Sequence, residues 1–157
     1  MTSMRVLEVQ SDLAIEPDAF LSQCCLRTVN WELAPIVKMT APRHWQRSRI
    51  VDWEVGGELF KSWILLFGLL PVDRHAFRLR KAAFDRGFDE CSSSWMNKAW
   101  NHRREIRERG GGCTVVDRVE VVSRVPLLLP LLFPIYRLIF RHRHGRLRKK
   151  FGAGAAP

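Results

Sequence analysis

Acidic residues are missing from the last part of this chain of 157 residues, because no Asp or Glu follows Glu120. Eight Arg and Lys residues lie in that region and supply most of the net charge of +10. A basic segment on a nearly neutral body favours contact with an anionic surface. The other interpretation is a helix end that is simply solvated.

An apolar run long enough to cross a bilayer is also missing. The longest segment without charge, residues 125–136, is too short for a membrane span and contains three prolines. Glu8 and Asp12 interrupt the first apolar stretch, which is not typical of a signal peptide. We therefore expect a cytoplasmic protein, peripheral to a membrane only if the basic segment binds one.

Motifs for metal, phosphate and covalent chemistry are lacking. The four cysteines, at positions 24, 25, 91 and 113, have no zinc spacing and are typical of core residues in a reducing compartment. His142 and His144 would point in nearly opposite directions on a helix, so they do not predict a shared metal. There is no phosphate loop, nucleophile elbow or paired-carboxylate motif, and we expect neither a metal nor a cofactor.

The length predicts one domain, residues 1–151, followed by a disordered tail at 152–157. Residues 5–15 alternate as a strand with one buried face, and Pro17 and Thr28 each suit the start of a short helix.

Several strands are then expected in succession. Gly56-Gly57 predicts a hairpin between strands at 47–55 and 59–68, and residues 110–112 predict another between 98–108 and 113–123. Further strands are expected at the ranges 74–84 and 88–97.

The segment 122–151 organises the chain. Residues 127–140 are apolar on nearly every side of a helical wheel, so a helix there must be covered on several sides. We predict an α+β fold in which a curved antiparallel sheet wraps around a long C-terminal helix within 131–149, with two short helices after the first strand. An antiparallel sandwich with a loose tail is the alternative. The prolines at 126, 130 and 134 leave open whether the helix is kinked or delayed.

The chain resembles the START-like, or SRPBCC, superfamily with its helix-grip fold. The similar segments are VNWELAP at 29–35, LLPVDRH at 69–75, W-x-H-R-R-x-I at 100–106, D-x-V at 117–119 and LIFRHRHGRL at 138–147. They look like those of a bacterial ligand-binding branch related to polyketide cyclase/dehydrase-type proteins. The resemblance implies a hydrophobic cavity between sheet and helix for a lipid-like or polycyclic molecule. It does not imply one reaction.

Alternation along the strands suggests which residues face such a cavity. The candidate ligand-binding residues are Trp63, Phe67, Phe77, Trp95, Trp100, His102, Val115 and Tyr136. For any one of them, a packed core is the simpler interpretation.

His102 and Asp117 are the catalytic candidates, because a carboxylate on the next strand can orient an imidazole as a general base. A structural hydrogen bond, or pairing of Asp117 with a neighbouring arginine, is the alternative interpretation.

Three functions therefore remain open. The first is binding of a hydrophobic small molecule, which we favour over catalysis. The second is a cyclase or dehydratase activity through His102 and Asp117. The third is binding to an anionic membrane through Arg141, Arg143, Arg146, Arg148, Lys149 and Lys150. Nucleic acid is a poorer partner, because the basic run lacks interleaved stacking aromatics. The sequence indicates neither the ligand nor the oligomeric state.

Overall fold

A curved sheet and one long helix dominate the computed structural model, which describes residues 4–154. The sheet has seven antiparallel strands in the order β1-β7-β6-β5-β4-β3-β2. The strands are β1 Met4–Leu13, β2 Val37–Met39, β3 Glu58–Leu66, β4 Leu70–Arg80, β5 Gly87–Ser94, β6 Asn97–Arg109 and β7 Gly112–Ser123.

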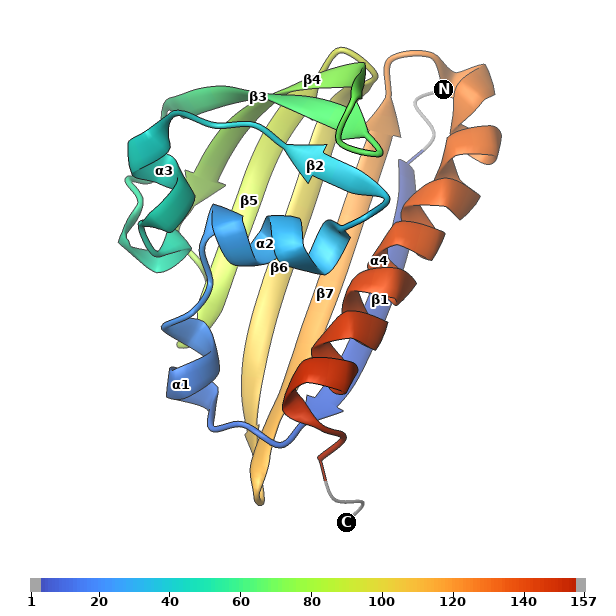
Figure 1. The fold of residues 1–157 in the computed structure, drawn as a ribbon. Coiled ribbons are helices and arrows are strands. Elements are labelled where there is room, and N and C mark those ends of the chain that lie inside the picture. The colour runs from blue at the N-terminus through green and yellow to red at the C-terminus, as the bar shows by residue number, and fades with distance from the viewer. Residues whose placement is uncertain (1–3, 155–157) are drawn as a thin grey trace.

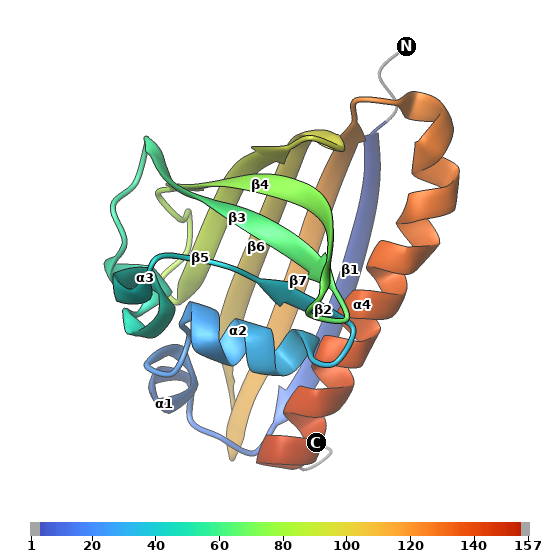
Figure 2. The ribbon, with the colours of Figure 1, turned by 45° about the horizontal axis from the view of Figure 1, so that its top comes forward.

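The helices lie on the concave side of this sheet (Figure 1). They are α1 Pro17–Leu21, α2 Leu26–Leu33, α3 Arg43–Arg47, the 3-10 turn η1 Ile50–Asp52, the 3-10 turn η2 Pro126–Leu128 and α4 Leu129–Phe151. Figure 2 shows α4 running beside β1, with α2 crossing in front of the middle strands. The predicted helix-grip architecture is thereby confirmed, and the sandwich alternative is excluded because α4 packs on the sheet.

The C-terminal helix starts earlier than expected, at Leu129. Pro130 stands in its first turn, where a missing N–H costs little because no intrahelical acceptor is due there. Pro126 opens η2, and only Pro134 lies inside the helix. Two of the three prolines that left a delayed start open, Pro130 and Pro134, therefore belong to the helix itself.

The predicted hairpin at Gly56-Gly57 was wrong. Residues 47–55 contain the end of α3 and all of η1, in place of a strand. Arg49 and Asp52 form an exposed ion pair three residues apart, which suits a helical turn. Trp53 turns inward and packs against Phe77, whereas its neighbours in the sequence are exposed. This single buried side chain produced the alternating pattern that was interpreted as a strand.

The hairpin at residues 110–112 does join β6 to β7, and Gly111 takes a left-handed φ of 80° in its turn. The short edge strand β2 was missed, because three residues carry almost no periodic signal. Beyond α4, Ala153 forms an isolated bridge with Leu13, so residues 152–154 are ordered where disorder was expected. Residues 155–157 lie outside the described range.

Three apolar clusters fill the space under the helices. One lies under α2 and η1 and includes Trp53, Phe60 and Phe77. A second joins α1 and the end of α4 to the sheet through Leu13, Val115 and Leu147. The third, around Val119 and Phe140, lies under the middle of α4.

Candidate functional site

A cavity of about 390 Å³ lies between the sheet, α2 and the first half of α4. This volume is in the range of small-molecule sites, which are mostly apolar with a few polar groups. The apolar lining comprises Leu26, Val29, Leu33, Val37, Met39, Ile50, Ile64, Leu66, Val72, Phe77, Phe88, Met96, Trp100, Leu132, Ile135, Tyr136, Ile139 and Phe140. The polar lining comprises Asp73, His75, Glu90, Asn97, His102 and Arg143.

The cavity opens between the start of β4 and α4. Val72 and Ile135 both line it, and each has nearly half of its surface exposed. The wall of the cavity therefore reaches the molecular surface at these two side chains.

Two histidines flank one carboxylate on the cavity wall. His75 Nε2 lies 2.5 Å from Glu90 Oε1, and His102 Nδ1 lies 3.5 Å from Glu90 Oε2. The other ring nitrogen of His102 contacts Asp117 Oδ1 at 2.8 Å. Both ring nitrogens of His102 therefore face carboxylates, which favours its doubly protonated form.

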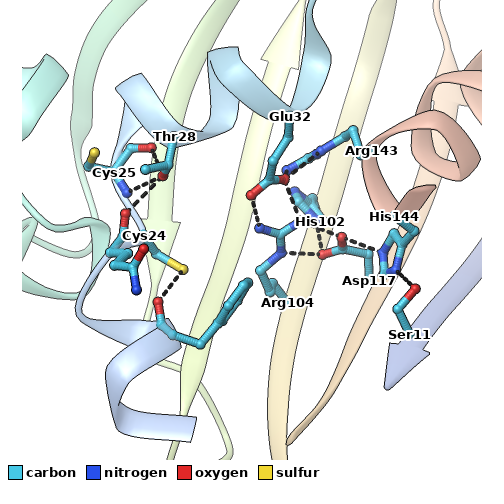
Figure 3. A network of polar contacts seen from close by, with 12 residues as sticks. Ser11, Cys24, Cys25, Thr28, Glu32, His102, Arg104, Asp117, Arg143 and His144 are labelled. Carbon is cyan, nitrogen blue, oxygen red and sulfur yellow. Dashed lines mark hydrogen bonds and ion pairs between the residues drawn. The ribbon is translucent and has the colours of Figure 1, made fainter. Parts of the chain in front are cut away.

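A buried ion network continues from Asp117 through Arg104 and Glu32 to Arg143, which itself lines the cavity (Figure 3). Arg104 lies directly opposite Asp117 in the β6–β7 register, and its Nε and Nη2 contact the carboxylate at 2.8 and 2.6 Å. The same guanidinium contacts both oxygens of Glu32 on α2 at 2.9 Å. Arg104 thus joins a helix to the sheet through two bidentate contacts.

The last helix closes this network from the other side. Arg143 Nη2 contacts Glu32 Oε2 at 2.8 Å, and His144 contacts Asp117 Oδ2 at 2.9 Å through Nε2. The second nitrogen of His144 lies 2.9 Å from Ser11 Oγ on β1. Figure 3 shows these side chains converging from α2, β6, β7, α4 and β1.

The electrostatics of the network favour its charged form. Burial raises the pKa of the Glu90 carboxyl, but hydrogen bonds from His102 and His75 outweigh burial and bring it down to about 2. Burial lowers the pKa of His102, yet the charge of Asp117 and the hydrogen bonds raise it overall. The pKa of Asp117 is held well below its usual range, because Arg104 and His102 outweigh the effect of burial.

Four of the predicted ligand-binding residues line the cavity: Phe77, Trp100, His102 and Tyr136. The other four, Trp63, Phe67, Trp95 and Val115, do not line it.

Those four residues occupy three other places in the fold. Trp63 and Trp95 form an edge-to-face pair away from the cavity, and Arg74 stacks on Trp63. Phe67 is exposed at the β3–β4 turn, and Val115 is fully buried in the cluster near α1. Alternation indicates which face of a strand a side chain is on. Where the cavity lies along that strand depends on tertiary packing, which alternation does not indicate.

The basic residues of α4 separate into two groups. Arg143 was expected on an anion-binding surface, but it is 4% exposed and paired with Glu32. Arg146 is partly buried and stacks on Trp31. Arg148 contacts Ser11 but stays exposed. Only part of the basic run is therefore available to a partner. The exposed members are Arg141, Arg148, Lys149 and Lys150.

Glu32, His75, Glu90, Arg104 and Asn97 were not predicted as site residues. Arg104 lies two residues after His102 on β6, so both side chains are on the same face of the strand. The alternation that placed His102 inside therefore predicted an inward position for Arg104 as well. Glu32 lies on α2 among apolar residues, and only the tertiary structure shows which arginines meet it.

No group of three or more His, Cys, Asp or Glu side chains between residues 4 and 154 is arranged to hold a metal ion. His142 contacts the carbonyl oxygen of Ala34, on the opposite side from His144. Within the same part of the chain, no helix has the length and apolarity needed to cross a membrane.

A family model described as Domain of unknown function (DUF8410) matches residues 11–151. The chain belongs to the DUF8410 family. No curated protein matches it. The DUF8410 match includes α1 to α4, the cavity and the ion network.

Solved structures show which fold this DUF8410 chain has. The crystal structure of protein CV1439 from Chromobacterium violaceum matches with a TM-score of 0.64 and 14% identity, covering 94% of this chain and 97% of that one. The crystal structure of Ara h 8.0201 matches with a TM-score of 0.54 and 12% identity, covering 94% of this chain and 99% of that one. A START superfamily protein from Mycobacterium smegmatis matches at 0.51 and 9%, covering 94% and 98%. The START-like, or SRPBCC, helix-grip fold is thereby confirmed.

Proposed function

We propose that this chain binds a hydrophobic small molecule, lipid-like or polycyclic, in the cavity between the sheet and α4. The observation that carries the proposal is the 390 Å³ cavity with an almost entirely apolar wall. Apolar groups facing such a space lose packing contacts, and a bound apolar ligand would restore them. The fold shared with the START superfamily protein is consistent with this role.

A titration with a fluorescent fatty acid tests the proposal. The parent protein should bind the probe, and Ile139→Trp should abolish binding because the larger side chain occupies the cavity. Leu138→Trp is the matched control, because this neighbouring residue on α4 is 60% exposed and does not line the cavity. Equal binding by both variants, or no binding by the parent, would contradict the proposal.

A cyclase or dehydratase activity through His102 and Asp117 stays a second hypothesis. The two side chains are in contact at 2.8 Å, which the general-base arrangement requires. However, Asp117 is also held by Arg104 and His144, and His102 faces a second carboxylate. These contacts support a structural role for the pair. In a turnover assay, His102→Ala must reduce the rate by at least about 100-fold to support the enzymatic hypothesis.

Binding to an anionic membrane stays a third hypothesis. Arg141, Arg148, Lys149 and Lys150 are exposed near the end of α4, and no acidic residue follows Glu120. Each cation near an anionic surface contributes about 1 kcal/mol of attraction. Because Arg143 and Arg146 are used inside the fold, we expect this attraction to be weak.

A further inference from the structure

Exposed apolar side chains gather on both sides of the cavity mouth. Six of them, each more than half exposed, lie at the β3–β4 turn and along η2 and the first half of α4. We call this set the apolar rim: Phe67, Leu69, Leu70, Leu127, Leu131 and Leu138. Val72 and Ile135, which line the cavity and reach the surface, lie in the same two segments. Figure 2 shows the β3–β4 turn pointing towards α4, so the rim borders the mouth from both sides.

The rim is unfavourable for a chain that stays alone in water. Leu127 and Leu69 are 90% and 80% exposed, so neither gains from packing inside the fold. Phe67 has a φ of 52°, in the left-handed region that bulky residues rarely adopt, and its side chain also stays mostly exposed. Apolar surface gathered in this way is typical of a contact with a membrane or with another protein.

The two segments of the rim contain no acidic residue, and cations stand beside them. Neither residues 67–72 nor residues 125–138 include Asp or Glu. The Lys38 side chain passes next to Gly68 in the β3–β4 turn. Arg137 is exposed on α4. The charge around the rim is therefore suited to an anionic partner.

The outer face of α4 combines apolar contact with positive charge. Leu131, Leu138 and Arg141 follow one another at intervals of seven and three residues, so they share one face of the helix. All three are exposed. A second copy of this chain would bring these cations against its own, which is repulsive, whereas anionic lipid headgroups would pair with them. A lipid surface therefore fits the rim better than a second copy does.

We propose that the apolar rim docks on a bilayer that contains anionic lipid. The rim side chains enter the zone between headgroups and acyl chains, and Lys38, Arg137 and Arg141 contact the headgroups. This inference goes beyond the proposed function and adds an apolar contact to the cations of the membrane hypothesis. The cavity mouth then faces the bilayer, so a lipid-like ligand passes from one to the other without crossing water.

Both kinds of contact are needed for this docking. A small apolar insertion gives only marginal, reversible attachment to a membrane, and stable attachment takes a second signal. The headgroup contacts supply that signal, and salt screens them. High salt should therefore release the docked protein, although the rim itself is uncharged.

Cosedimentation at low salt with vesicles of phosphatidylcholine and phosphatidylserine tests the rim. The double variant Leu131→Ser, Leu138→Ser should bind at least about tenfold more weakly than the parent, because two leucine side chains no longer leave water on docking. Both residues are largely exposed, so the urea midpoint should stay close to the parent value.

The matched control is the double variant Val51→Ser, Val55→Ser. It also replaces two exposed apolar side chains by serine, but in and after η1, outside the rim. It should bind the vesicles like the parent. Unchanged binding by the Leu131→Ser, Leu138→Ser variant, an equal loss for the control, or no binding by the parent would each overturn the inference.

Paramagnetic broadening of amide signals locates the contact without any substitution. With nanodiscs of the same lipids that carry a nitroxide-labelled lipid, the ¹⁵N-labelled protein should show the strongest broadening at residues 67–72 and 125–138. Broadening confined to residues 141–150 would mean docking through cations alone and would overturn the role of the rim.

Sedimentation of the protein without lipid tests the competing partner, a second copy of the chain. We expect a monomer. A dimer that Leu131→Ser, Leu138→Ser converts to a monomer would make the rim an interface between copies and would also overturn the inference. The fatty-acid titration contains no vesicles, so failure of the docking inference and failure of the proposed function are distinguishable.

Discussion

The two halves of α4 meet the rest of the molecule in different ways. The first half contributes Leu132, Ile135, Tyr136 and Ile139 to a cavity and leaves Leu131 and Leu138 largely exposed. The second half is fixed by buried Arg143, His144 and Leu147, which contact α2, β7 and the apolar cluster near α1. One helix thus combines an anchored end with an end that borders open space. We infer that stability resides mainly in the second half and ligand binding in the first.

Removing the central carboxylate of the network should have the largest effect. Asp117→Asn leaves Arg104, His102 and His144 with a neutral partner in a fully buried site. We expect a loss of about 3–5 kcal/mol in the free energy of unfolding, measured by urea denaturation. Asp52→Asn, which breaks an exposed ion pair, should change it by less than about 1 kcal/mol. Similar values for the two variants would contradict the anchoring role of the network.

Truncating an apolar side chain in each half compares the packed end with the cavity. Leu147→Ala removes a 2% exposed side chain from a filled cluster and should cost about 2–5 kcal/mol. Ile139→Ala enlarges a space that already exists and should cost about 1 kcal/mol, because fewer packing contacts are lost. Urea midpoints of both variants, measured with the parent, give the difference directly. An equal loss would mean that the two halves are packed alike.

The pH dependence of stability should report the charged groups that join the cavity to the network. The pKa of Glu90 is lowered from 4.5 to about 2, so its contribution is present above pH 4.5 and lost as the pH falls towards 2. The pKa of His102 is raised above 6.5, so its contribution is present below pH 6.5 and lost as the pH rises through the raised value. The urea midpoint of the parent should therefore decline both as the pH falls below 4.5 and as it rises above 6.5.

His102→Gln separates the two limbs of that profile. The variant should lose the alkaline decline that the His102 proton causes, because glutamine does not titrate. Its acidic decline should persist in part, because Glu90 still accepts from His75. An unchanged alkaline limb would show that another group controls it.

The smallest effect is expected at the exposed cations of α4. Cosedimentation with vesicles containing phosphatidylserine should show weak binding at low salt that disappears at high salt. Replacing Arg141 and Lys149 by Ser should weaken it, whereas replacing exposed Arg43 and Arg47 on α3 should not. Equal weakening by the two pairs would indicate a response to net charge alone, and no binding by the parent would refute the membrane hypothesis.

The sequence predicted the architecture because its signals are local. The apolar segment 127–140 predicted a helix packed on the sheet, and the glycines at 110–112 closed the correct hairpin. The helix is covered on fewer sides than expected, because Leu131 and Leu138 remain largely exposed. The same local logic failed at residues 47–55, where the buried side chain of Trp53 stands between exposed residues and imitates a strand.

The site was predictable only in part. Parity placed His102, Trp100 and Phe77 inside, and the structure finds all three in the cavity wall. The alternation could not show where along a strand the cavity ends. Trp63 and Val115 were therefore wrongly expected in the cavity wall. Arg143 was counted with the basic surface because its partner, Glu32, lies 111 residues away in the chain.

An NMR titration of the ¹⁵N-labelled protein with 2-naphthol would test the difference between the two halves of α4 most directly. We expect amide shift changes at residues 132–140 of α4 and at His75, Glu90 and His102 on the cavity wall. We expect little change at residues 145–150, because none of them lines the cavity. Changes concentrated at residues 145–150, or none in either half, would contradict a ligand cavity under the first half of α4.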